Sequence, residues 1–218
     1  MPFLRLESHM PDVSLGVWKI EEDELYFLER VKLYEHEWVR LGEIMHPQKR
    51  LEWLSSRLCL KDLISIANHT RVESLSTASG KPYLSSNSHF ISYSHSNHYS
   101  AAIASPHQEV GIDIEYRHHE RNLRTRFLFM NDDELAAYDR LPSFELFLLI
   151  WSAKETLYKI VGQGFAFKHH IGLIMIDFAL ATNGMLPACV QKDGFIQHYE
   201  VHYYLTADYI LTYAGAGL

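Results

Sequence analysis

Cysteine is scarce in this chain, which has only Cys59 and Cys189 among its 218 residues. The two lie far apart and each has apolar neighbours in the sequence, so a disulfide framework is not expected. Two buried free thiols in a reducing cytosol are the default interpretation.

Long apolar runs are missing as well. No stretch of about 18 apolar residues occurs, so we expect no membrane-spanning helix. The first ten residues, MPFLRLESHM, lack a basic region followed by an apolar one, and no signal peptide is expected. The protein is therefore predicted to be cytoplasmic. Apolar residues make up 47% of the chain, which is enough to form a substantial core.

An excess of positive charge is also absent. The formal net charge of −7 argues against a general nucleic-acid-binding protein, although it allows a local basic patch. A phosphate-binding loop of the Walker type is not found, because the glycines at 162 and 164 lack its sequence context.

Two short stretches carry the strongest pattern in the sequence. In residues 110–115, VGIDIE, apolar and polar residues alternate, so Asp113 and Glu115 project from one face of a strand about 7 Å apart. In residues 151–159, WSAKETLYK, a spacing of four residues puts Trp151, Glu155 and Lys159 on one face of a helix. Brought together, these stretches supply three carboxylates and an ammonium group, and carboxylate oxygens suit Mg²⁺.

Hydrophobic periodicity and turn residues predict the other elements. Strands are expected at 16–20, 89–94, 99–104, 171–178, 199–205 and 209–214. One or two helices are expected within 21–38, with further helices at 47–67, 131–141 and 144–161. Turns are expected at 79–82, 96–97, 183–184 and 193–194.

The two motif stretches together resemble the paired signature of the 4′-phosphopantetheinyl transferase superfamily, G-x-D-x-E and W-x-x-K-E-[SA]-x-x-K. The defining positions are filled by Gly111, Asp113, Glu115, Trp151, Lys154, Glu155 and Lys159. Thr156 stands where the family more often has Ser or Ala. The loop Gly80-Lys81-Pro82 and the segment Ser94-His95-Ser96 also follow the family order, whereas Ser92 replaces a frequent Asn. The resemblance covers roughly residues 40–180.

This resemblance implies an α+β fold of two similar α+β halves, residues 1–105 and 106–218. In the family these halves pack pseudo-symmetrically, with the active site in the cleft between them. The length resembles the larger, pseudo-dimeric (surfactin-synthetase-activating) branch, which acts as a single chain, so a monomer is expected.

The implied activity is transfer of the 4′-phosphopantetheine group of coenzyme A to a serine of an apo acyl or peptidyl carrier protein, which leaves 3′,5′-ADP. By resemblance, Mg²⁺ or Mn²⁺ binds Asp113, Glu155 and, less firmly, Glu115. Either Glu155 or a metal-bound water takes the serine proton, and Lys159 neutralises the leaving pyrophosphate oxygen. Lys154 supports the site or contacts a phosphate.

Further residues are implied to bind the two substrates. Ser94 and His95, with the loop that contains Lys81 and Pro82, match the family residues for the 3′-phosphate of coenzyme A. Arg40 stands where the family tends to have a basic residue, and Arg50 and Arg57 are weaker candidates. The basic segment 117–126 suggests a docking patch for the acidic carrier, at Arg117, Arg121 and Arg124.

Two other functions remain open from the sequence. The chain could be a non-catalytic coenzyme A or nucleotide binder, although a binder has no need of placed carboxylates. It could also be a metal-dependent phosphohydrolase that releases product without a carrier. The carrier itself, from fatty-acid, polyketide or nonribosomal-peptide synthesis, is left open.

Overall fold

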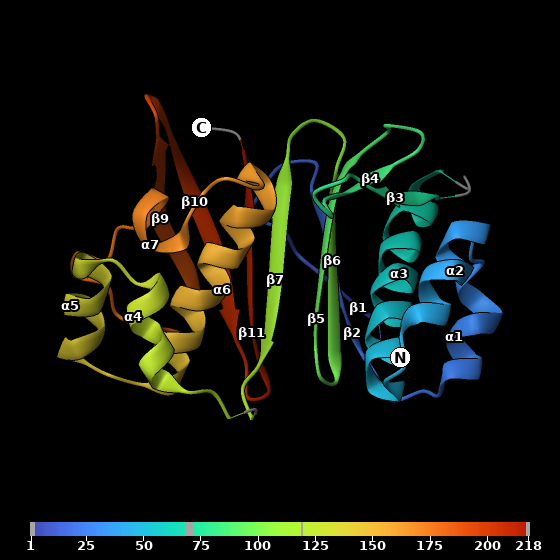
Figure 1. The fold of residues 1–218 in the computed structure, drawn as a ribbon, viewed down its shortest axis with the longest axis horizontal. Coiled ribbons are helices and arrows are strands. Elements are labelled where there is room, and N and C mark those ends of the chain that lie inside the picture. The colour runs from blue at the N-terminus through green and yellow to red at the C-terminus, as the bar shows by residue number, and fades with distance from the viewer. Residues whose placement is uncertain (1–2, 69–71, 119, 217–218) are drawn as a thin grey trace. The chain divides into compact units, whose positions relative to one another are not determined.

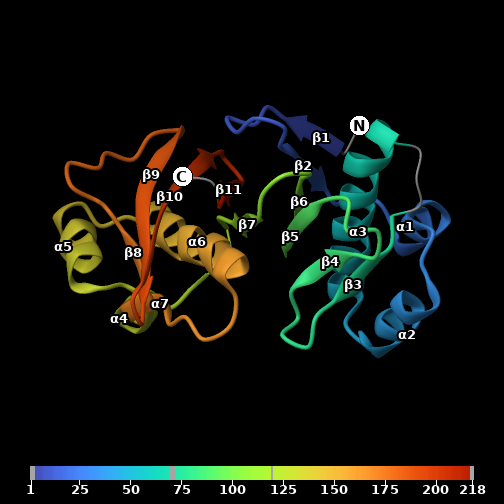
Figure 2. The same cartoon turned by 90° about the horizontal axis from the view of Figure 1, so that it is seen from above.

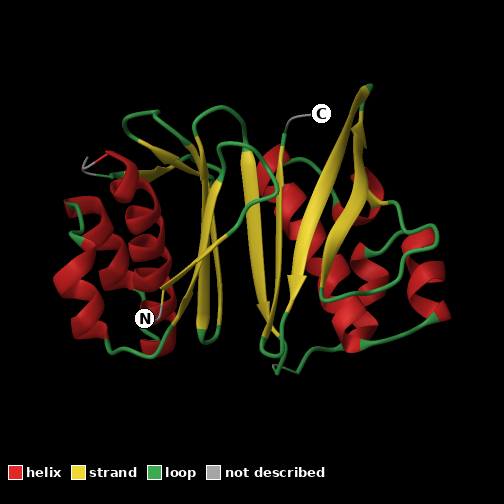
Figure 3. Cartoon of the chain, turned by 180° about the vertical axis from the view of Figure 1, so that it is seen from behind, coloured by secondary structure: helices red, strands yellow, loops and turns green. Residues whose placement is uncertain are grey.

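The computed structural model describes residues 3–68, 72–118 and 120–216, with the backbone alone at 65–68. The chain forms two compact units, Met1–His107 and Gln108–Leu218. Each unit combines helices with an antiparallel sheet, and its helices lie on one face of that sheet (Figure 3). The mixed α+β class is as predicted, whereas a pseudo-symmetric pair of halves remains a prediction.

The N-terminal unit is built on a four-stranded sheet in the order β1-β2-β6-β5. Its strands are β1 (Phe3–Leu6), β2 (Ser14–Lys19), β5 (Phe90–Ser96) and β6 (Tyr99–Ser105). The helices are α1 (Glu24–Val31), α2 (Glu35–Glu43) and α3 (Pro47–Asn68). A separate two-stranded ribbon is formed by β3 (Ser74–Ser76) and β4 (Pro82–Leu84).

Helix α3 forms the centre of this unit, between the sheet and α1 (Figure 2). Its apolar positions Leu54 and Leu58 recur every four residues, so they share one face and are buried with Trp18 and Phe27. The tight turn at Asn97, with φ of 55°, joins β5 to β6 as the sequence predicts. The helices expected within 21–38 and 47–67 are confirmed.

The C-terminal unit has a five-stranded sheet in the order β7-β11-β10-β9-β8 (Figure 1). Its strands are β7 (Val110–Tyr116), β8 (Ile171–Leu173), β9 (Asn183–Lys192), β10 (Phe195–Leu205) and β11 (Tyr209–Gly215). The helical elements are the 3₁₀ turn η1 (Leu123–Thr125), α4 (Arg126–Phe129), α5 (Asp132–Arg140), α6 (Phe144–Val161) and α7 (Phe167–His170).

Helix α6 packs against the sheet of this unit, and most of its length is buried. It begins where the hydroxyl of Ser143 accepts a hydrogen bond from Leu146 N, and it ends at Gly162, whose φ is +82°. Both limits agree with the predicted helix 144–161. The predicted helix 131–141 is confirmed as α5, with Asn131 as its N-cap.

Two predictions in this unit are wrong. The strand expected at 171–178 is limited to β8, which ends at Leu173. The turn expected at Asn183-Gly184 is absent, because these residues begin β9 and pair with Tyr204 and Tyr203 of β10. The sheet ladder overrides the local turn preference of Asn-Gly here.

Two expectations can be compared with the described residues: that the chain has no disulfide and that it has no membrane-spanning helix. Neither cysteine forms a disulfide, but Cys189 is only partly buried, whereas Cys59 is fully buried. Among the described residues, no helix has the length and apolar character needed to cross a membrane.

Candidate functional site

Strand β7 and helix α6 approach each other closely at Gly111. A Cβ atom at this position would lie 2.2 Å from the carbonyl oxygen of Thr156 and 2.9 Å from Cγ1 of Ile160. Only glycine, which has no Cβ, permits this contact. The glycine of the first motif therefore lets β7 lie directly against the helix that carries the second motif.

Thr156, at the position where the family more often has Ser or Ala, has a definite partner. Its hydroxyl donates to Thr212 O at 3.1 Å and lies 2.7 Å from the Thr212 hydroxyl. Ser152, one turn earlier on α6, lies 2.8 Å from the same hydroxyl. These buried hydroxyl groups fix α6 on β11, the neighbour of β7.

Lys159 joins the two motifs directly. Its ammonium group donates to Ile112 O at 2.8 Å and to Asp113 Oδ1 at 2.9 Å. The side chain of Lys159 is about one quarter exposed, whereas that of Asp113 is buried. The structure thus places a cation from α6 on a carboxylate of β7.

Two acids of the motifs, Glu115 and Glu155, lie in an environment that opposes their ionisation. Burial, followed by the charge of Asp113, raises the pKa of Glu115 to about 7. Burial and the charge of Asp113 also raise the pKa of Glu155. Asp113 therefore acts on both other carboxylates. The polar face of β7 is a buried acidic cluster and not a solvated strand face.

Cations partly compensate this cluster. Arg121 Nη2 donates to Glu115 Oε2 at 2.5 Å, and the guanidinium carbon lies 5.6 Å from the centroid of the Trp151 ring. Arg121, Trp151 and Lys159 all act to lower the pKa of Glu115, against the stronger effect of burial. Arg121, expected at the carrier-docking patch, thus contacts the acid cluster.

The acid cluster fits a hard divalent cation in its donor chemistry. Asp113, Glu115 and Glu155 offer only carboxylate oxygens, and their mutual repulsion would be relieved by a positive ion. Within the described part of the chain, no three potential ligands are already gathered at one point.

Lys154 lies elsewhere, inside the C-terminal unit. Its ammonium group is 2.7 Å from Glu134 Oε2 and donates to Phe167 O at 2.8 Å and Ile171 O at 2.6 Å. Both side chains of the ion pair are fully buried. This position favours the supporting role expected for Lys154 over a contact with a phosphate.

An apolar pocket of about 720 Å³ adjoins the acid cluster. Arg121 and Trp151 belong to both, since they line the pocket and interact with Glu115. Aromatic rings from three helices, α4, α6 and α7, and from one loop make up much of the wall: Phe129, Phe147, Trp151, Tyr158, Phe165 and Phe167. The volume lies within the range of small-molecule sites. The sequence did not indicate this pocket, because its walls come from distant segments.

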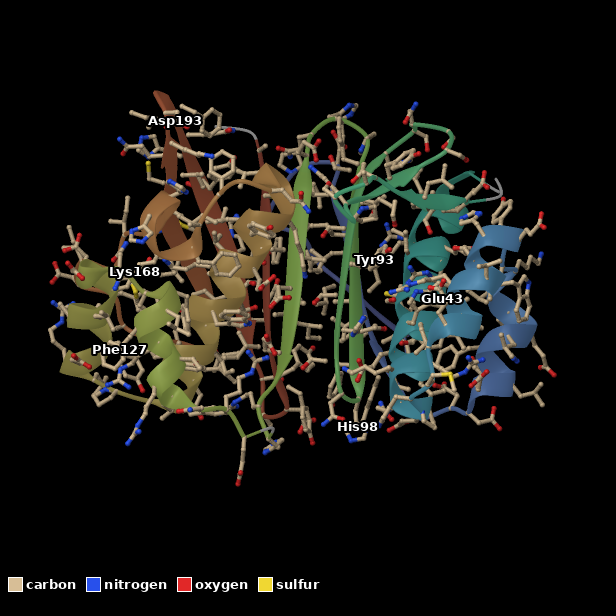
Figure 4. The ribbon with its side chains drawn as sticks, in the orientation of Figure 1. Glu43, Tyr93, His98, Phe127, Lys168 and Asp193 are labelled. Atoms are coloured by element: carbon tan, nitrogen blue, oxygen red, sulfur yellow. The ribbon has the colours of Figure 1, made fainter. Side chains whose placement is uncertain are left out.

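The surface beside this pocket is both basic and apolar. Leu123, Phe127 and Leu128 are exposed, and Lys168 Nζ reaches Phe127 O at 3.4 Å. Figure 4 shows Phe127 and Lys168 on the same side of the C-terminal unit. Arg124 is exposed, whereas Arg117 is paired with Glu145 at 2.6 Å. His119, which falls in the basic segment, lies outside the described residues.

The residues expected to bind coenzyme A lie in the N-terminal unit. On β5, Ser94 is buried, and His95 Nδ1 lies 2.9 Å from Glu52 Oε2 of α3. Arg40, on α2, is exposed and paired with Glu43 at 2.6 Å. Lys81 and Pro82 follow Gly80, whose φ is +84°, at the turn that leads into β4.

The weaker arginine candidates serve internal contacts. Arg50 pairs with Glu24 and donates to Leu41 O, while Arg57 stacks on Trp53 at 3.5 Å and donates to the Tyr93 hydroxyl. The structure therefore gathers the predicted residues into two groups, one in each unit. Their use in a single active site remains a prediction.

One comparison with known proteins gives a match. Residues 109–214 match the family model of the 4′-phosphopantetheinyl transferase superfamily. The matched segment lies within the C-terminal unit and contains Asp113, Glu115, Glu155 and Lys159. No curated protein matches the chain. The family match supports a general phosphopantetheinyl transferase function.

Proposed function

We propose that this protein transfers the 4′-phosphopantetheine group of coenzyme A to a serine of an apo acyl or peptidyl carrier protein, in the manner of the larger, single-chain branch of the superfamily. The observation that carries the proposal is the contact of Lys159 with Asp113 beside Glu115 and Glu155, within the segment that matches the family model. A protein that only bound a nucleotide would have no need of this buried acid cluster.

The reaction is the attack of a serine oxygen on the phosphorus that bears the pantetheine arm. The new bond joins this oxygen to phosphorus, and the bond to the bridging oxygen breaks, so 3′,5′-ADP leaves. Glu155, or a water bound to the metal, would accept the serine proton. Lys159 stabilises the negative charge that develops on the leaving oxygen.

A divalent cation completes the proposal. Asp113 and Glu155 would hold Mg²⁺ or Mn²⁺, with Glu115 as a weaker third ligand. When bound, the ion neutralises charge on the pyrophosphate. When no ion is bound, the guanidinium group of Arg121 partly neutralises the acid cluster through its contact with Glu115.

The aromatic pocket is proposed to receive the pantetheine arm. The arm is bonded to the reacting phosphate and extends away from it. The pocket begins at Arg121 and Trp151, which also interact with Glu115. At the other end of coenzyme A, the 3′-phosphate nucleotide is proposed to bind Ser94, His95, Lys81, Pro82 and Arg40.

Intact-mass analysis of several apo carriers tests the proposal. Incubation with the protein, coenzyme A and Mg²⁺ should add one phosphopantetheine group to at least one carrier, and chelation of the metal should prevent this. D113N and K159M should each reduce the rate by about 100-fold or more. The control D133N removes an exposed acid of α5 and should leave the rate unchanged.

Other outcomes would support the alternative functions. Binding of coenzyme A without transfer to any carrier would indicate a nucleotide binder. Release of nucleotide in the absence of a carrier would indicate a phosphohydrolase.

The carrier is proposed to dock on the basic surface around Arg117, Arg121 and Arg124. Because Arg121 also contacts Glu115, the substitution R124E is the cleaner test. It should raise KM for the carrier by about tenfold, because like charges repel at the interface, and spare the affinity for coenzyme A. The control R140E reverses an exposed arginine of α5. Equal KM values for R124E and wild type would contradict the docking assignment.

A further inference from the structure

Glu52 is a buried carboxylate in the N-terminal unit that the motifs do not include. It lies on α3, where its side chain is only 2% exposed, and it has two nitrogen-bearing neighbours, His95 and Lys49. His95 Nδ1 is 2.9 Å from Glu52 Oε2, and Lys49 Nζ is 2.6 Å from the same oxygen. A buried acid on α3 thus contacts the imidazole ring of His95 in the segment Ser94-His95-Ser96.

A second contact joins the same helix face to the same hairpin. Gln48, one turn before Glu52 on α3, donates from its amide nitrogen to Asn97 O at 2.7 Å. Asn97 forms the turn that follows His95 on β5. Because positions four apart share a helix face, Gln48 and Glu52 together hold the end of this hairpin against α3.

Glu52 remains ionised despite its burial. Burial alone would raise the pKa of its carboxyl group, but the close contacts with His95 and Lys49 outweigh this effect and leave the pKa below its ordinary value. The negative charge is therefore permanent at neutral pH, and it lies beside His95 Nδ1.

We propose that Glu52 is a positioning residue that holds Nδ1 of His95, so that Nε2 is the ring nitrogen presented to the 3′-phosphate of coenzyme A. The inference rests on the proposed function, which assigns His95 to this phosphate. The Nδ1 atom is buried and lies outside hydrogen-bond geometry, so its contact with Glu52 is a close approach of 2.9 Å, while about a third of the His95 side chain is exposed. A carboxylate this close to one ring nitrogen restricts the orientation of the ring and leaves the other nitrogen for a ligand.

The charges of this group are consistent with an anionic ligand. The ammonium group of Lys49 offsets the single negative charge of Glu52. The carboxylate thus orients the donors without reversing the sign of the site.

The experiment compares coenzyme A with 3′-dephospho-coenzyme A as donors for carrier modification. In E52Q, kcat/KM for coenzyme A should fall about tenfold, which corresponds to about 1.4 kcal/mol, while kcat/KM for the dephospho donor stays at the wild-type value. H95N should show the same selective loss, and the double variant should lose no more than either single one. A general structural defect would instead reduce both donors.

Two further variants distinguish a specific effect on the 3′-phosphate from a general loss of stability. E52D keeps the charge next to Lys49 but shortens the reach to His95, so it should show the selective loss with a smaller effect on the melting temperature. The matched control E37Q removes another buried carboxylate of the same unit, paired with Lys61 at 3.0 Å. It should lower the melting temperature without changing the ratio between the two donors.

The inference fails if folded E52Q or E52D discriminates between the two donors as wild type does, or loses activity equally with both. If wild type transfers nothing, the proposed function fails, and the inference is then judged by calorimetry with adenosine 3′,5′-bisphosphate and adenosine 5′-phosphate. Tighter binding of the bisphosphate that E52Q abolishes would support it, and equal binding of both nucleotides by wild type would overturn it.

Discussion

At Gly111 a single missing side-chain atom decides whether the two motifs meet. The neighbouring atom, Thr156 O, belongs to the backbone of α6 and is not able to move aside like the end of a flexible side chain. Asp113 lies only two residues further along β7. Any displacement of this strand therefore also moves the carboxylate away from Lys159.

G111A should lower the free energy of unfolding by about 1–3 kcal/mol, because the added methyl group overpacks the strand–helix contact. Carrier modification should fall as well, since the Asp113–Lys159 contact is disturbed. Urea denaturation and the mass assay measure the two effects.

The control for this substitution is G42A. Gly42 lies on α2, and a Cβ there has no neighbour within 4 Å. Alanine in a helix should be neutral or stabilising by about 0.5–1 kcal/mol. Equal stability losses for G111A and G42A would contradict the steric explanation.

The pattern of alternating residues predicted which residues of β7 share a face, but it did not predict what covers that face. Asp113 and Glu115 are buried because α6 and Arg121 lie against them, and no local pattern reports a partner such as Lys159, which is 46 residues from Asp113 in the sequence. The same applies to Lys154, whose partner Glu134 comes from α5. The pairing of Glu52 with His95 was likewise not evident from the sequence.

Among the elements of the N-terminal unit, Arg50 connects three helices. Its guanidinium group, on α3, holds both oxygens of Glu24 on α1 at 2.8 and 2.6 Å. It also donates to Leu41 O at 2.6 Å and Ile44 O at 3.2 Å, at the end of α2. An arginine considered for phosphate binding therefore stabilises the helical layer.

The pair of Glu24 and Arg50 should make stability depend on acid pH. The hydrogen bond from Arg50 lowers the folded-state pKa of Glu24 below its ordinary value of 4.5. The unfolded chain then binds more protons in this range, so the stabilisation is present above pH 4.5 and is lost as the pH falls through the lower folded-state value. In E24Q, the free energy of unfolding should therefore fall less as the pH is lowered. Urea denaturation at a series of values from about pH 7 down to about pH 3, on both sides of the ordinary carboxyl pKa, measures this.

E29Q serves as the control for this prediction. Glu29 is exposed on the same helix, and its contact with Arg30 is long at 3.4 Å. Such surface pairs contribute little to stability. If E24Q and E29Q gave the same pH profile as wild type, the Arg50 contact would not be a source of acid sensitivity.

The elements with long periodic patterns were predictable from sequence, and the short ones with conflicting signals were not. Helix α6 has a cap, an apolar face and a terminal glycine, all of which agree. Strand β9 begins with Asn-Gly and contains Pro187, which both argue against a strand interior, yet pairing with β10 holds it. Long-range pairing decides such segments, and it is not visible in one window of sequence.

On the scale of the whole molecule, the predicted residues divide between two compact units. The acids and Lys159 belong to Gln108–Leu218, whereas His95, Lys81 and Arg40 belong to Met1–His107. The family match covers only the former. Under the proposed function, this division separates the chemical step from recognition of the 3′-phosphate of the donor.

Variants in the two units should therefore fail in different ways. D113N should abolish transfer and its Mg²⁺ dependence, while binding of adenosine 3′,5′-bisphosphate in calorimetry is retained. H95N should weaken binding of that nucleotide about tenfold and leave the Mg²⁺ concentration for half-maximal rate unchanged. A shift of the Mg²⁺ requirement in H95N would argue against a division between the units.

Glu134, finally, takes part in more than the ion pair with Lys154. Its carboxylate accepts from Asn131 N at 2.8 Å and from Leu173 N at 2.8 Å, so one side chain fastens the start of α5, the middle of α6 and the end of β8. Local fraying of any one of these segments would leave a charge stranded in the interior. In native-state hydrogen exchange, the three segments should consequently open as one cooperative unit, with shared exchange rates, and not as separate ends that loosen independently.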